Sequence, residues 1–183
     1  LFPYAISALV RLQRFEKALE VYGAWKDRCE LDAQNLAFGG YLLSRKDRHD
    51  EALAEYGKSL ELDPMNPWAL NNAGYTLNLL ERYKEAVPLF DRALTIEPEA
   101  AYPLNNRGLA KWKLGDREGG LADIARGLEL DPGNSYGHRN LGIHHLDEGR
   151  SGLALDLFLK AQSIDPETHM IKELITRAVS ELK

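Results

Sequence analysis

The chain repeats itself with a period of 34 residues, and this period constrains the fold more than any other feature. Prolines, glycines, small residues and large apolar residues each recur at that interval. The four sets are Pro64, Pro98, Pro132 and Pro166; Gly40, Gly74, Gly108 and Gly142; Ala18, Ala52, Ala86, Gly120 and Ala154; and Tyr22, Tyr56, Phe90, Ile124 and Phe158. Independent sets that share one interval indicate a repeat architecture running through almost the whole chain.

Each repeat is predicted to contain two helices. In residues 67–98, apolar residues recur at three- and four-residue steps in both halves, which is the pattern of amphipathic helices. Asn66 followed by Pro67 predicts a helix start, because asparagine caps helices and proline suits their first position. The second helix must end before Pro98, because the residue preceding proline disfavours the helical conformation. Pro88 is expected near the first turn, where its missing N–H costs little.

The same positions resemble the tetratricopeptide repeat family. The resemblance rests on residues in the third and fifth repeats: Ala73, Gly74, Leu77, Ala86, Phe90, Ala93 and Pro98, and Leu141, Gly142, His145, Ala154, Phe158, Ala161 and Pro166. It implies an all-α, right-handed superhelix with repeats at about 1–32, 33–66, 67–100, 101–134 and 135–168. A last amphipathic helix within 167–183 is expected to cap the stack at 169–183, giving a single domain over 1–183.

Two repeats depart from the family pattern. The first has Glu30 where the proline is expected, and the fourth has Gly119, Gly120 and Gly127 in its second helix. Each glycine inside a helix costs about 0.5–1 kcal/mol relative to alanine. That helix is therefore expected either to pack unusually closely or to be the softest of the set. The glycines of the first helices, such as Gly108, are expected to let paired helices approach each other while a large residue fills the gap.

Composition excludes some functions. The net charge of -5 and pI near 5.6 argue against a nucleic-acid-binding protein, which normally presents a basic face. No apolar run approaches the roughly 20 residues of a membrane span, and no signal-peptide pattern is present.

The chain opens at Leu1 without methionine, so we expect a fragment. The single cysteine, Cys29, fits a reducing compartment, and a cytoplasmic location is expected; its thiol is expected to be buried or idle.

The family resemblance implies that the first helix of each pair lines a concave groove. The expected groove residues are aromatic and amide-rich: Trp68, Asn71, Asn72, Tyr75, Tyr102, Asn105, Asn106, Leu109, Trp112, Tyr136, Arg139, Asn140 and Ile143. Asn72, Asn106 and Asn140 resemble the asparagine ladder that grips extended polypeptide in the repeats of O-GlcNAc transferase. Asparagine has both a donor and an acceptor, so the same residues could instead bond neighbouring helices. Phe38 stands at the equivalent position of the second repeat and would end the ladder.

The partner is therefore expected to be a protein or peptide. The basic clamp that binds chaperone tails in this family needs lysine or arginine where Asn71, Asn106 and Asn140 stand, so a chaperone-tail adaptor is not expected. Arg139 and Lys113 leave a modest positive spot. Two function classes remain open: a non-catalytic scaffold or adaptor that holds an extended peptide or a partner helix, and a regulatory or substrate-recruiting segment of a larger enzyme. Self-association through the ends of the stack is a third reading.

No catalytic, cofactor or metal site is predicted. His144 and His145 are adjacent, and adjacent helical residues point about 100° apart, which argues against a shared metal ion. His145 is expected to fill a position usually held by tyrosine, with His144 packed between helices. Gly119 and Gly120 make no phosphate loop, because no strand precedes them and no Lys-Ser/Thr follows. Trp25 is expected to fill the end of the stack.

Overall fold

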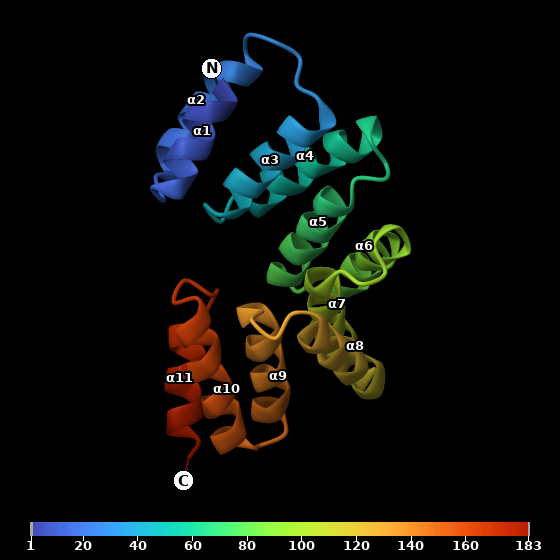
Figure 1. Ribbon diagram of the computed structural model, residues 1–183, viewed down its shortest axis with the longest axis vertical. Helices are drawn as coiled ribbons and strands as arrows, with labels where there is room; N and C mark the ends of the chain where they lie inside the picture. Colours follow the sequence, from blue (N-terminus) through green and yellow to red (C-terminus); the bar gives the residue numbers. More distant parts are fainter. Residues whose placement is uncertain (1, 183) are drawn as a thin grey trace. The chain divides into compact units, whose positions relative to one another are not determined.

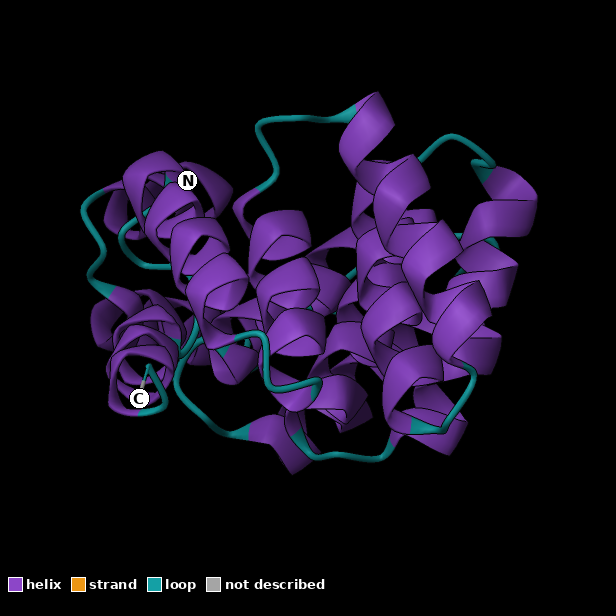
Figure 2. Cartoon of the chain, turned by 90° about the horizontal axis from the view of Figure 1, so that it is seen from below, coloured by secondary structure: helices purple, strands orange, loops and turns teal. Residues whose placement is uncertain are grey.

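The computed structural model describes residues 2–182, and every regular element within that range is an α-helix (Figures 1 and 2). The eleven helices of that range are α1 (Phe2–Arg11), α2 (Phe15–Lys26), α3 (Ala33–Ser44), α4 (His49–Leu62), α5 (Pro67–Leu79), α6 (Tyr83–Ile96), α7 (Ala101–Lys113), α8 (Arg117–Leu130), α9 (Ser135–Asp147), α10 (Ser151–Ile164) and α11 (Ile171–Ser180). This confirms the predicted all-α class, and within the two units described below α1 packs on α2, α3 on α4, α7 on α8 and α9 on α10.

The repeated prolines set where the second helices end. Helices α4, α6, α8 and α10 end at Leu62, Ile96, Leu130 and Ile164, each two residues before its proline. Polar caps mark the start of three of the first helices, α3, α5 and α9, as predicted for Asn66. Its side chain accepts a hydrogen bond from the Ala69 amide at 3.0 Å, and Pro67 is the first helical residue. Asp32 and Asn134 cap α3 and α9 in the same way.

Two local predictions were wrong. Pro88 lies beyond the first turn, as the sixth residue of α6, where its ring removes a hydrogen bond to the carbonyl of Lys84. The last helix is shorter than predicted and begins at Ile171. The preceding residue, Met170, has a positive φ of 57°, so the backbone leaves the helical region there and residues 167–170 form a turn.

The chain divides into two compact units, Leu1–Arg82 and Tyr83–Lys183. The boundary falls between α5 and α6, inside the third predicted repeat. The first unit holds α1–α5 and the second holds α6–α11. The prediction of a single domain over 1–183 stays a prediction, and each unit is described by itself below.

In the first unit, glycines allow bulky rings to lie directly against a helix backbone. Tyr56 of α4 is 1% exposed and covers Gly40 of α3, where an added Cβ would lie 2.7 Å from the ring. Tyr22 of α2 covers Gly39 still more closely. The Tyr22 hydroxyl donates to Glu55 at 2.7 Å, and Lys26 reaches the same carboxylate. The predicted role of the glycine, close approach beside a large residue, is confirmed.

In two helix pairs of the second unit, a glycine likewise lies under a bulky side chain of the partner helix. Gly142 of α9 lies under the ring of Phe158, and Gly108 of α7 lies under Ile124. In the α7–α8 pair Gly120 also faces Gly108, and a Cβ at Gly120 would lie 2.7 Å from the Gly108 carbonyl oxygen. The glycine-rich helix α8 is therefore closely packed, one of its two predicted outcomes.

Helix α11 closes a small apolar core with α9 and α10 (Figure 1). The buried members are Leu146, Ala154, Phe158, Ala161, Ile171 and Ala178. Each buried large aliphatic or aromatic side chain contributes roughly 1.5–3 kcal/mol of hydrophobic stabilisation. Helix α11 thus packs against α10, and its role as the cap of the stack stays a prediction.

Candidate functional site

An aromatic pocket of about 490 Å³ lies on the first unit. Its walls come from α1, α2, α3 and α5, and the lining residues are Pro3, Ser7, Trp25, Gln34, Asn35, Phe38 and Trp68. We call this the aromatic pocket. Pockets of this size that combine aromatic and polar side chains can bind small ligands and anchoring side chains.

The rings around the aromatic pocket support one another. Phe38 and Tyr41, one turn apart on α3, stack with centroids 5.9 Å apart, and Trp68 of α5 lies 6.5 Å from Phe38 and 6.0 Å from Tyr41. Trp25 stacks on Phe2 at 6.0 Å. Such arrangements stabilise aromatic pairs beyond the burial of their surface. Trp68 nevertheless remains 42% exposed, so the pocket offers rigid apolar area that water still reaches.

Sequence reasoning found Trp68 but missed three of its neighbours. Trp25 was predicted to fill the stack end, Phe38 was considered only as the end of a ladder, and Tyr41 was not considered as a groove residue. Phe38 and Tyr41 occupy the same repeat positions as Asn72 and Tyr75. Applying the groove register to the second repeat would have found both.

The other predicted groove residues of the first unit are half-buried. The Asn72 side-chain nitrogen donates to the Trp68 carbonyl at 2.8 Å, within its own helix. The Thr76 hydroxyl in turn donates to the Asn72 carbonyl at 2.9 Å. Asn71 and Tyr75 lie on the same helix, α5, and are also half-buried.

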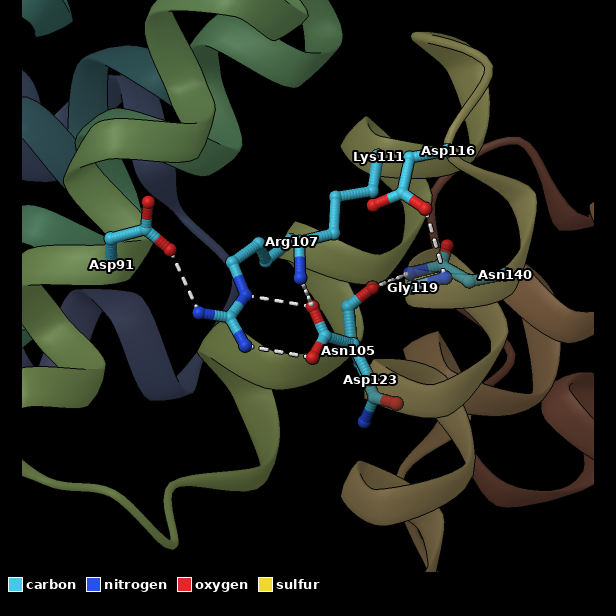
Figure 3. Close-up of polar contacts among 8 residues, drawn as sticks. All are labelled: Asp91, Asn105, Arg107, Lys111, Asp116, Gly119, Asp123 and Asn140. Atoms are coloured by element: carbon cyan, nitrogen blue, oxygen red, sulfur yellow. Dashed lines mark hydrogen bonds and ion pairs between the residues drawn. The ribbon is translucent and has the colours of Figure 1, made fainter.

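In the second unit, most of the predicted groove residues lie inside the protein. The buried ones are Asn105, Asn106, Leu109, Trp112, Arg139 and Asn140, while Tyr136 and Ile143 are half-buried and Tyr102 is 54% exposed. Asn140 donates to the Asn105 carbonyl at 2.8 Å and accepts two hydrogen bonds from Arg139. Figure 3 shows the Asn105–Asn140 contact. Of the two roles that the sequence allowed for this asparagine, Asn140 therefore has the one between helices: it bonds α9 to α7.

Charged side chains connect α6, α7 and α8 in the second unit. Arg107 of α7 makes two hydrogen bonds of 2.7 Å to Asp123 of α8 and one of 2.7 Å to Asp91 of α6 (Figure 3). Lys111 pairs with the same Asp123 at 2.9 Å. Because Asp123 is 8% exposed, these cations satisfy a buried carboxylate, as buried charges require. The network explains local packing and offers no site of its own.

A second polar cluster surrounds the end of α9. His144 is 3% exposed and meets the Trp112 ring edge-on, with centroids 3.9 Å apart. Burial, followed by the nearby charges of His145 and Arg150, lowers the pKa of His144 to about 4, so it is neutral at pH 7. The expectation that His144 packs between helices is confirmed by its burial. The geometric argument against convergence was wrong: ligand atoms of His144, His145 and Glu148 all lie within 4.8 Å of one another.

The structure also bears on the expectations for Cys29 and for membrane-spanning helices. Cys29 is exposed, and its thiol lies 3.5 Å from the Trp25 carbonyl. Of the two alternatives expected for this thiol, buried or idle, the first is wrong and the second stays a prediction. Among the described helices, none is both long enough and apolar enough to cross a bilayer.

Comparisons with known proteins agree with this geometry. Family models described as tetratricopeptide or TPR repeats match residues 40–80, 69–99 and 105–167, which together are more than half of the chain. No curated protein sequence matches significantly.

Among solved structures, a thermophilic TPR protein of Thermus thermophilus is 20% identical, with TM-score 0.79, and the match covers 98% of this chain and 96% of that one. MamA of Desulfovibrio magneticus is 22% identical, with TM-score 0.70 and coverage of 92% and 96%. YrrB, a TPR protein, is 23% identical, with TM-score 0.63 and coverage of 96% and 90%. The matched repeats and the shared all-helical fold lead to one conclusion: the chain belongs to the tetratricopeptide repeat family.

Proposed function

We propose that this chain is a non-catalytic protein-binding module, a scaffold or adaptor that holds a peptide segment through its aromatic pocket. The observation that carries the proposal is the preformed wall of Trp25, Phe38 and Trp68. Large aromatic residues in a pocket are the usual anchors of protein interfaces. Fold alone does not define function, so the proposal rests on this site.

The chemistry of the pocket indicates the kind of segment it would hold. Its aromatic rings suit a bulky aliphatic or aromatic side chain, while Gln34 and Asn35, which also line it, can donate to and accept from a peptide backbone. An extended segment with one large apolar anchor fits these features. The similar protein YrrB is described as having an unusual peptide-binding site, which supports a peptide as the ligand class.

The test is a selection from a random peptide library, followed by affinity measurements on the best binder. Trp68→Ala is expected to weaken binding at least tenfold, because truncation of a hot-spot aromatic typically costs about 2 kcal/mol or more. Tyr102→Ala is the matched control, since Tyr102 occupies the same repeat position in the next repeat and is also exposed.

Unchanged affinity in Trp68→Ala would refute the proposal. An equal loss in Tyr102→Ala would instead extend the binding surface into the second unit, as the groove prediction has it. Circular dichroism of both variants separates loss of binding from loss of folding, because Trp68 and Tyr102 are exposed and their truncation leaves the buried cores intact.

A further inference from the structure

The polar cluster at the end of α9 combines the ligand types of a transition-metal site. His144, His145 and Glu148 each offer a ligand atom, and these atoms lie within 4.8 Å of one another. His144 Nε2 is 3.6 Å from a carboxylate oxygen of Glu148. The two imidazole rings are 5.1 Å apart by centroid. None of these three side chains takes part in the aromatic pocket, so the cluster is independent of the proposed function.

Helix geometry explains how adjacent histidines can converge on one ion. Successive residues are about 100° apart around a helix. Glu148 therefore lies about 40° from His144 and about 60° from His145, in the angular gap between them. The Glu148 carboxylate can therefore lie near both imidazole rings. Residues three or four positions apart, as Glu148 is from His145 and His144, are neighbours on a helix surface.

The guanidinium of Arg150 contacts two members of the cluster, His144 and Glu148. One terminal nitrogen of its guanidinium contacts His144 Nε2 at 3.1 Å and also reaches the Glu148 carboxylate. Gly149, with φ of 74°, turns the chain at this point. The arginine side chain is 45% exposed, so it can swing into solvent without breaking a packed core. The site already places a cation between an imidazole nitrogen and a carboxylate.

Side chains of α7 pack against the end of α9 beside the cluster. Trp112 packs edge-on against His144, and its indole N–H donates to Asp147 at 3.2 Å. Lys113 pairs with the same carboxylate at 2.5 Å, which leaves Asp147 engaged with α7. The Trp112 ring is therefore the neighbour that packs against a ligand of the cluster, His144.

We propose that His144, His145 and Glu148 form a binding site for a divalent transition-metal ion of the zinc class, with Arg150 as a competing internal cation. Two imidazole nitrogens and one carboxylate oxygen are the ligands that Zn²⁺ takes in proteins, and three protein ligands leave one position open. Ca²⁺ and Mg²⁺ prefer sets made entirely of oxygen ligands. The site therefore selects zinc, cobalt or nickel over calcium.

The experiment is a calorimetric titration of Zn²⁺ into untagged, metal-free protein near neutral pH, with Ca²⁺ in parallel. The wild type is expected to bind one Zn²⁺ per chain and no Ca²⁺. Arg150→Gln is expected to bind Zn²⁺ at least tenfold more tightly, because it removes the competitor. His145→Ala and Glu148→Gln are each expected to bind at least tenfold more weakly.

His49→Ala is the matched control, since His49 also lies beside a carboxylate, that of Asp47 at 3.8 Å, but in the first unit. It is expected to leave affinity unchanged. The proposal is overturned if neither the wild type nor Arg150→Gln binds Zn²⁺, or if His49→Ala loses as much affinity as His145→Ala. Because Arg150→Gln is a gain of binding, a folding defect cannot mimic the expected result.

Discussion

Replacing Gly120 with alanine should test how closely α7 and α8 must approach. The added Cβ would lie 2.7 Å from the Gly108 carbonyl oxygen, 3.0 Å from the Trp112 backbone nitrogen and 3.2 Å from the Trp112 Cβ. Ordinary contact begins at 3.4 Å, so the two helices must separate by about 0.7 Å. A gap of that size forfeits about a quarter to a half of the dispersion attraction at each affected contact.

The magnitude follows from two opposing terms. Overpacking of this kind costs about 1–3 kcal/mol, and two of the three nearest atoms belong to the backbone, which cannot move aside as a flexible side chain would. The gain in helix propensity from glycine to alanine offsets about 0.5–1 kcal/mol. The net loss is expected to be up to about 2.5 kcal/mol, or up to roughly 10 °C in melting temperature for a chain of this size.

The control is Gly152→Ala in α10, where the nearest atom to the new Cβ is Leu182 Cδ2 at 3.7 Å, an ordinary contact. This variant should be stabilised by about 0.5 kcal/mol. Denaturant titration gives the two changes in free energy of unfolding, and amide exchange should report faster opening in α7 and α8 of Gly120→Ala alone. If Gly120→Ala is as stable as Gly152→Ala, the close approach is not a packing constraint and the reasoning fails.

Three further outcomes are expected. Pro88→Ala should raise stability by about 1–3 kcal/mol, because it restores a backbone donor inside α6, and thermal melting measures this. Burial raises the pKa of Glu55, but hydrogen bonds from Lys26, Tyr22 and Lys58 outweigh it and hold the pKa below its ordinary value. The stability from Glu55 is thus present above that ordinary value and is lost as pH falls through the lowered one, so the deficit of Glu55→Gln, measured by denaturant titration at several pH values, should shrink in acid. Cys29 should react fully with a thiol reagent in the native protein, since it is exposed.

The sequence predicts the helices of this fold well because the same start and stop signals recur in successive repeats. Proline positions predict the four helix ends, and Asn66 with Pro67 predicts a helix start. Pro88 was misplaced because α6 begins earlier than the apolar pattern alone indicates, and packing holds a proline that local propensity would exclude.

The candidate sites were less predictable, since they depend on contacts between repeats. Burial of Asn140 follows from its bond to the Asn105 carbonyl, 35 residues away in sequence, which no pattern within one repeat can report. The aromatic pocket combines Trp25, Phe38 and Trp68 from three different repeats. The cluster of His144, His145 and Glu148 depends on the rotamers of the two imidazole side chains, and sequence spacing does not determine these rotamers.

The prolines that end α4, α6, α8 and α10 have an evolutionary consequence. Because the second to fifth 34-residue blocks each carry their own termination signal, any of these blocks can be gained or lost by recombination without altering where the surviving helices end. A deletion of one full block, such as 101–134, keeps the register of the remainder. A deletion of half a block would leave one helix without its partner and expose the apolar side that the partner covers.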